Sequence, residues 1–268
     1  MFSKKQTALK FLIFATILFS TTMAKAEPRV LLNEGINAYQ QGQWDLAREK
    51  FSQLLGDKRW EFVGLYNLGN VATRQKHFGE ALGYFRRALA LKPQDKDTWF
   101  NYRFVLNNTP NQLALGRNLS NYEFIRNEYL NRFSFTQSLI VLFFASLFML
   151  WNLYKYIRNY KFKGEEDKSL GVPPLLLIIW GILFLVSISS STLKLIDTFT
   201  ERGTIVVAKV DLRSGPSETN ASMSELTEGL EVLVQSDEKD WKQVTHPNGL
   251  TGWVPKNSIM TTTGWGPW

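Results

Sequence analysis

The sequence predicts a multidomain membrane protein with an all-α repeat module, a two-helix transmembrane hairpin and a small all-β barrel. Three observations predict this fold class. Residues 27–108 repeat with a constant period, two long apolar runs in the middle of the chain carry no charge, and residues 203–261 consist of short β-rich runs separated by turn residues. The length of 268 residues is enough for about two domains.

The bulk composition excludes several classes of function. The chain has no cysteine, which removes disulfides, thiol nucleophiles and Cys-type metal sites. The net charge of +7 comes largely from the leader and from the segment between the two apolar runs. Because no basic stripe interleaved with aromatic residues is present, we do not expect nucleic acid as a partner.

Residues 1–26 have the pattern of a secretory signal peptide. Basic residues precede an apolar run at 11–19, and Ala24 and Ala26 supply the small side chains that a signal peptidase needs. The alternative is an uncleaved anchor. The apolar run is short for a membrane span, which favours cleavage.

Each of the two later apolar runs is long enough for a membrane-spanning helix. Residues 133–154 and 169–193 contain no charged residue, and about 20 such residues cross the hydrocarbon core. We expect transmembrane helices at 134–154 and 170–193, both in contact with membrane lipid.

The charge of the connecting loop predicts the orientation. The loop at 155–168 carries five basic residues, namely Lys155, Arg158, Lys161, Lys163 and Lys168. Basic loops stay in the cytoplasm, and an exported N-terminus gives the same topology. We therefore expect a protein of the bacterial inner membrane whose N- and C-terminal domains are both periplasmic.

The N-terminal module resembles tetratricopeptide repeats, which are helix–turn–helix units with a period of about 34 residues. At that offset Gly35 matches Gly69, and Phe51 matches Phe85. The glycines let paired helices approach closely, and the phenylalanines fill the space between them. A third copy begins at 99–102 and then lapses, so we expect a single capping helix there.

The same register aligns three asparagines, and the resemblance places this position on the concave face of the repeats. A carboxamide both donates and accepts, so it can hold a peptide backbone without reading its sequence. The alternative is that the asparagines bond between helices or face solvent. The predicted groove residues for a protein partner are Asn33, Tyr66, Asn67, Asn70, Arg74 and Asn101.

Two segments outside the modules carry weaker patterns. Apolar residues in the juxtamembrane segment 109–133 recur at helical spacing, which indicates an amphipathic helix or, more simply, a continuation of the first span. The tail 262–268 is expected to be disordered, or to rest at the membrane interface through Trp265 and Trp268.

The C-terminal runs resemble a bacterial SH3-type domain. The matching sequence segments lie at 210–217, 228–232, 240–244 and 248–254, in that order. The last segment begins with Asn-Gly, a hairpin turn signal, because both residues accept a positive φ.

Two tryptophans of this domain, Trp241 and Trp253, are candidates to line a ligand groove. The alternative is that one or both belong to the core, and for Trp253 the core is the favoured interpretation. The proline-binding aromatic signature of eukaryotic SH3 domains is not evident, so a ligand here would be peptidoglycan or protein.

The sequence contains no catalytic or cofactor motif that we recognise. Its two histidines, His77 and His246, lie in different modules, and there is no GxSxG, HExxH, phosphate-binding or dinucleotide-binding motif. We expect no enzymatic activity, no catalytic residue, no metal site and no cofactor.

The module order resembles the BatE-type proteins of aerotolerance (Bat) operons, which are encoded beside a MoxR-type AAA+ ATPase and membrane-anchored von Willebrand factor A proteins. The resemblance implies a non-enzymatic envelope scaffold in a Bat/MoxR-type complex linked to stress tolerance, with the von Willebrand factor A-type Bat proteins as partners. The alternative is a protein that senses or anchors the cell wall by binding peptidoglycan through the SH3-like domain. A wall hydrolase is the third hypothesis, and it lacks an acid–base pair or a metal centre in the sequence.

Overall fold

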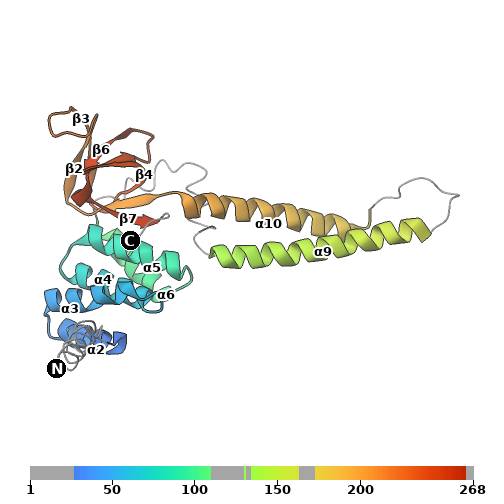
Figure 1. Ribbon diagram of the computed structural model, residues 1–268, viewed down its shortest axis with the longest axis horizontal. Coiled ribbons are helices and arrows are strands. Elements are labelled where there is room, and N and C mark those ends of the chain that lie inside the picture. Colours follow the sequence, from blue (N-terminus) through green and yellow to red (C-terminus); the bar gives the residue numbers. More distant parts are fainter. Residues whose placement is uncertain (1–26, 110–129, 131–133, 163–172, 264–268) are drawn as a thin grey trace, which may run out of the picture.

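The computed structural model describes residues 27–109, 130, 134–162 and 173–263. The predicted signal peptide, most of the juxtamembrane segment, most of the cytoplasmic loop and the end of the tail lie outside these residues. Figure 1 shows a helical module, a β-barrel stacked on it, and a long two-helix hairpin that projects away from both.

The helical module consists of two helix pairs and one further helix, which confirms the predicted all-α repeat architecture. Its elements are α2 (Pro28–Gln40), α3 (Trp44–Ser52), the short η1 (Gln53–Gly56), α4 (Glu61–Arg74), α5 (Phe78–Leu91) and α6 (Lys96–Asn107). Helix α6 covers the start of the third copy, and its first turn is capped by Asp95, whose side chain accepts from the Thr98 amide at 2.8 Å.

The turn inside each pair repeats with the same geometry. Gly42 (φ 74°) and Lys76 (φ 63°) are one repeat period apart in the sequence, and both adopt the left-handed conformation that ends a helix. In each turn the following amide donates back to the helix: Gln43 to the Ala38 carbonyl and His77 to the Ala72 carbonyl, both at 2.9 Å. The structural repeat therefore has the period seen in the sequence.

Packing within the pairs also repeats. A Cβ atom on Gly35 would lie 2.5 Å from the ring of Phe51, and a Cβ on Gly69 would lie 2.5 Å from the ring of Phe85. Both rings are buried, with 1% and 0% exposure. The absence of a side chain at each glycine thus makes room for the aromatic ring of the second helix.

The hairpin consists of α9 (Phe135–Phe162) and α10 (Leu175–Phe199), two helices that are long and apolar enough to span a membrane. The rings of Phe148 and Trp180 stack at 4.7 Å, and the Ser191 hydroxyl donates to the Ser138 carbonyl. Most of the remaining apolar surface of both helices is exposed, as expected where lipid is the solvent rather than water.

The helix ends differ from the boundaries expected for the spans. Helix α9 continues past residue 154 to Phe162, and α10 extends past residue 193 to Phe199. The backbone hydrogen bonds of a helix do not depend on the polarity of its side chains, so each helix continues beyond the apolar run that predicted it. Helix α10 begins directly after Pro174, where proline fits the start of a helix.

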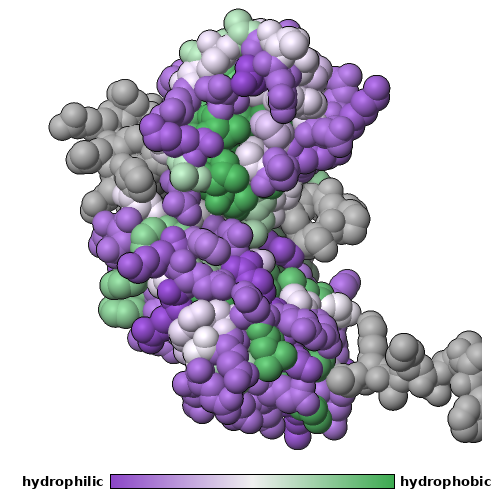
Figure 2. Space-filling model, turned by 90° about the vertical axis from the view of Figure 1, so that its left-hand side faces the viewer, coloured by the Kyte–Doolittle hydropathy of each residue, from purple (hydrophilic) through white to green (hydrophobic). Residues whose placement is uncertain are grey.

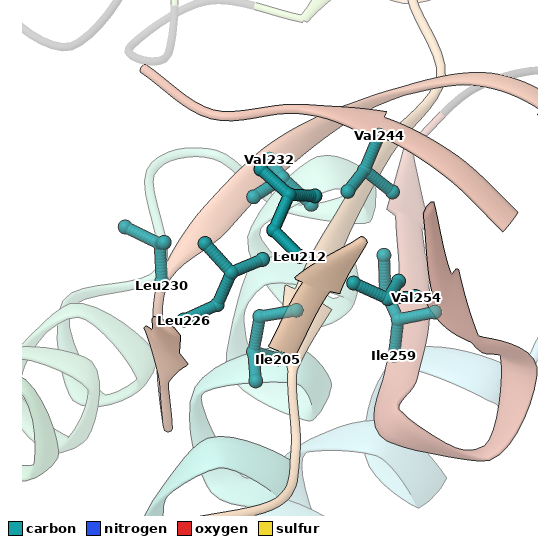
Figure 3. Close-up of a cluster of buried hydrophobic side chains, with 8 residues drawn as sticks. All are labelled: Ile205, Leu212, Leu226, Leu230, Val232, Val244, Val254 and Ile259. Atoms are coloured by element: carbon teal, nitrogen blue, oxygen red, sulfur yellow. The ribbon is translucent and has the colours of Figure 1, made fainter. Parts of the chain in front are cut away.

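The C-terminal module is one antiparallel seven-stranded sheet in the order β3-β2-β6-β5-β4-β1-β7, which confirms the predicted small all-β domain. Its core is a single cluster that gathers buried aliphatic side chains from every strand of the sheet (Figure 3). The elements are β1 (Arg202–Ile205), β2 (Lys209–Arg213), β3 (Ser222–Thr227), β4 (Glu231–Glu238), β5 (Trp241–Thr245), β6 (Thr251–Pro255), η3 (Lys256–Ser258) and β7 (Ile259–Thr263).

The predicted Asn-Gly turn joins β5 to β6. Gly249 has a φ of 92°, and the Asn248 side chain accepts from the Leu250 amide at 3.0 Å. The turn sets the register that places Thr245 opposite Thr251.

Helix α10 passes into β1 through only two residues, Thr200 and Glu201. The Thr200 amide donates to the last turn of α10, and the Glu201 carbonyl accepts from β4 at 2.8 Å. Beside this joint, Asp197 lies 3.5 Å from the Lys194 ammonium and 3.9 Å from Arg202 Nε. The helix and the sheet are therefore joined by hydrogen bonds and ion pairs.

Candidate functional site

The predicted groove residues lie on the first helices of the repeats: α2, α4 and α6. We call the surface that these helices present the A-helix face, defined by the residues Asn33, Tyr39, Tyr66, Asn67, Asn70, Arg74, Phe100, Asn101 and Phe104. Hydrogen bonds between neighbouring helices connect several of these residues, so the face is built from the register of the repeat.

Asn101 links the second and third of these helices. Its amide nitrogen lies 3.2 Å from the Tyr66 hydroxyl and donates to the Asn70 carboxamide oxygen at 2.9 Å. This is the bond between helices that the sequence left open as an alternative. The half-buried trio of Tyr66, Asn70 and Asn101 forms a polar centre held in a fixed orientation.

The other two asparagines are placed differently. Asn67 is half-buried and donates to the Val63 carbonyl at 2.8 Å, one turn earlier in α4. Asn33 is exposed on α2. The structure therefore brings Asn70 and Asn101 together, and it does not join the three aligned asparagines into one hydrogen-bonded set.

Arg74 supplies positive charge to the same face. Its Nε donates to the Tyr39 hydroxyl at 3.0 Å, and its guanidinium carbon lies 5.9 Å from the centroid of that ring. This hydrogen bond raises the pKa of Arg74, which is exposed and stays charged. Tyr39 is not among the predicted groove residues. It lies on α2, the first helix of the first repeat, and Arg74 lies on α4, the first helix of the second repeat.

Two aromatic residues of the face were missed from the sequence. Phe100 and Phe104, one turn apart on α6, are 72% and 53% exposed. Phe100 and Phe104 follow Tyr66 and Asn70 by one full repeat period of 34 residues. The alignment that picks out Tyr66 and Asn70 therefore also points to these two rings. The face thus combines fixed amides, a cation and two exposed rings.

On the barrel, the two candidate tryptophans lie on one outer face. Trp253 of β6 pairs with Gln243 of β5, while Trp241 of β5 pairs with Pro255. Both tryptophans are half-buried, and neither belongs to the core cluster. Trp253 alternates with the buried residues Gly252 and Val254, so the favoured interpretation of Trp253 as a core residue is wrong.

A cation lies next to these tryptophans. Arg213 of β2 pairs with Trp253 across the sheet, and its guanidinium donates to the carbonyls of Glu218 and Asn220 at 2.8 and 2.9 Å. We call Arg213, Trp241, Gln243 and Trp253 the tryptophan face. In Figure 2 the barrel is the upper lobe of the molecule, and on this side of it a few hydrophobic residues lie between hydrophilic ones.

Within the described part of the chain, no group of three or more His, Asp or Glu residues is arranged to hold a metal ion. His246 serves the β5–β6 turn, because its Nδ1 accepts from the Asn248 amide at 3.0 Å. His77 is exposed in the turn before α5.

Two parts of the chain match known families. Residues 62–95 match the tetratricopeptide repeat family, and residues 206–260 match the bacterial SH3 domain family. These matches confirm the two predicted modules, which are typically interaction modules.

The chain is also similar to two curated proteins, the "Cell division cycle protein 16 homolog" of Homo sapiens and that of Mus musculus. Each is 35% identical to it over 88 residues. The similarity covers 29% of this chain and 14% of each relative, so the chain spans a small part of their length.

Proposed function

We propose that this protein is a non-enzymatic, membrane-anchored scaffold that holds a protein partner on its A-helix face. The observation that carries the proposal is the pair of exposed rings, Phe100 and Phe104, beside the polar centre of Asn70 and Asn101. Aromatic side chains of this kind supply much of the binding energy of protein interfaces. Amides held in place lose little conformational freedom when they bind a peptide backbone.

The residues of the A-helix face indicate what kind of partner segment would bind there. An extended chain would pack apolar side chains on the two rings, bond the carboxamides with its backbone, and place a carboxylate near Arg74. A salt bridge of an exposed arginine contributes little affinity, so Arg74 would act mainly on orientation and on the rate of association.

The order of the modules supports a more specific role. It resembles that of BatE-type proteins, so we propose the von Willebrand factor A-type Bat proteins as partners, in a Bat/MoxR-type complex linked to stress tolerance. The two apolar helices and the basic loop support a location in the inner membrane with both modules in the periplasm.

A second candidate function is binding of peptidoglycan through the barrel. The tryptophan face favours it, because Trp241 and Trp253 lie on one outer surface with Arg213. Stacking of an aromatic ring on an apolar ligand surface and hydrogen bonds from a cation would suit a polar polymer. This function would make the protein a sensor or anchor of the wall.

Substitution of both exposed rings tests the first candidate. Phe100→Ala with Phe104→Ala should weaken binding of a purified von Willebrand factor A-type Bat domain from the same organism by about tenfold or more, since each ring contributes about 1 kcal/mol or more. Binding would be measured by interferometry on the full chain in nanodiscs.

The matched control for that experiment is Trp241→Ala with Trp253→Ala. It should leave binding of the Bat domain within about twofold of the unsubstituted protein and, under the second candidate, reduce retention on purified peptidoglycan. Full affinity in the phenylalanine variant together with loss of affinity in the tryptophan variant would move the protein partner to the barrel.

The orientation has a separate test. Reporter fusions after residue 108 and after residue 261 should report the periplasm, and a fusion at residue 163 should report the cytoplasm, because the basic residues of the loop remain inside. Paired alkaline phosphatase and fluorescent protein reporters give opposite signals in the two compartments. A cytoplasmic signal from either terminal fusion would refute the proposed topology.

A further inference from the structure

Helix α5 of the second repeat packs against strands β1 and β7 of the barrel (Figure 1). Two glycines one turn apart bring the helix close to the sheet. A Cβ atom on Gly79 would lie 2.5 Å from the Ile205 carbonyl oxygen, and a Cβ on Gly83 would lie 2.7 Å from Met260 Sδ. The obstacle at Gly79 is barrel backbone, which cannot move aside, so no side chain fits there, whereas at Gly83 it is the flexible end of Met260.

The barrel also contributes a glycine to the close contact with α5. Gly229, with a φ of 83°, precedes β4, and a Cβ atom there would lie 2.7 Å from Leu82 Cδ1. Leu82 is fully buried and belongs to the same apolar cluster as Phe85 and Val105. The core of the second repeat is therefore closed by the backbone of the barrel.

Polar contacts fix the orientation of this interface. The Glu228 carboxylate accepts from the Gly79 amide at 2.6 Å, in the first turn of α5, where amides lack a partner in the helix and negative charge is favoured. Arg86 donates to the Thr204 hydroxyl at 2.5 Å and to the Gly229 carbonyl at 3.2 Å. The same guanidinium lies over the ring of a tyrosine in α6, so one side chain contacts β1, the turn before β4 and α6.

We infer that the SH3-like barrel is the terminal cap of the repeat array, and that the two modules form one folding unit. Arrays of this kind need about three repeats and a capping element, because each repeat buries its apolar face only against a neighbour. This array has two helix pairs and the single helix α6. The barrel covers the side of α5 that the repeats leave open. This role is separate from partner binding on the A-helix face.

An engineered disulfide tests the docked geometry. A Cβ atom on Gly83 would lie 3.6 Å from the Cβ of Met260, within the range of a disulfide, and the chain has no other cysteine. Gly83→Cys with Met260→Cys should oxidise nearly completely in the full chain in membranes, seen as a mobility shift on a non-reducing gel. Gly83→Cys with Met223→Cys, on the exposed strand β3, should stay reduced.

The capping role needs its own measurement. Gly79→Leu should abolish that disulfide in the two-cysteine chain, because the new side chain would collide with β1. In the cysteine-free full chain, the same substitution should raise hydrogen exchange of the α5 and α6 amides at least tenfold. Leucine favours a helix over glycine, so a loss of protection would come from undocking. Ala90→Leu, at an exposed position of α5, is the control and should leave exchange unchanged.

The outcomes separate the alternatives. Absence of the Gly83–Met260 crosslink, or its persistence in the Gly79→Leu chain, would overturn the docked geometry. Loss of the crosslink with unchanged exchange in α5 and α6 would show two neighbours that fold independently and would overturn the cap. Loss of the crosslink with faster exchange would support it.

Discussion

Phe85→Ala should lower the free energy of unfolding of the repeat module by about 3–5 kcal/mol, because removal of a fully buried ring loses its burial and leaves a cavity. Phe85 has 0% exposure and fills the space that Gly69 leaves between α4 and α5. The measurement is denaturant unfolding of the full chain in nanodiscs, with hydrogen exchange of the α4 and α5 amides as the readout.

Phe100→Ala is the matched control for this substitution. It removes the same ring from a position that is 72% exposed, so it should change stability by no more than about 0.5 kcal/mol. Equal unfolding curves for Phe85→Ala and the unsubstituted chain would mean that the repeat register is wrong.

Gly69→Leu should destabilise the same pair of helices from the opposite side, by about 1–3 kcal/mol or more, because its Cβ would lie 2.5 Å from the Phe85 ring. The effect would be steric, since leucine is the better helix former. Gly35 and Phe51 have the same geometry in the first repeat, so Gly35→Leu should behave alike.

A double substitution shows whether the collision with Phe85 is the cause. Gly69→Leu with Phe85→Ala should cost less than the sum of the two single substitutions, by about 0.5–3 kcal/mol, because the leucine would occupy part of the cavity. Additive losses in the same unfolding assay would place the cause outside this pair.

The repeat packing could be predicted from the sequence because it depends on a short-range match. Gly35 with Phe51 and Gly69 with Phe85 lie one helix apart, and the constant repeat period carries this pairing directly. The barrel was predictable for a similar reason, since β-rich runs with an Asn-Gly turn at Asn248 specify hairpins locally.

The contact between α5 and the barrel could not be predicted in this way. Gly79 and Gly83 look like weak residues for a helix, and nothing nearby in the sequence shows that β1 and β7 will lie against them. Their partners Ile205 and Met260 belong to the other module, on the far side of both apolar helices in the sequence. Such contacts depend on how complete modules pack.

The sequence predicts which helices carry the candidate site residues, but it does not predict their hydrogen bonds. The repeat alignment places Asn67 and Asn101 on equivalent turns, yet Asn101 bonds from α6 to its neighbour α4 while Asn67 bonds within its own helix. The frequent burial of tryptophan side chains favours a core position for Trp253, but the structure places it on the outer face. Its alternation with the buried Val254 was the better guide to its orientation.

The joint between α10 and β1 limits how far the barrel can reach. Even a fully extended segment of two residues spans only about 7 Å, and here the Thr200 amide and the Glu201 carbonyl are both engaged in hydrogen bonds. If α10 spans the bilayer, as we propose, this short joint holds the barrel at the membrane surface, because no flexible linker lets it move away. Under the same proposal, a ligand of the tryptophan face would have to lie close to the membrane, as a second membrane-anchored protein would.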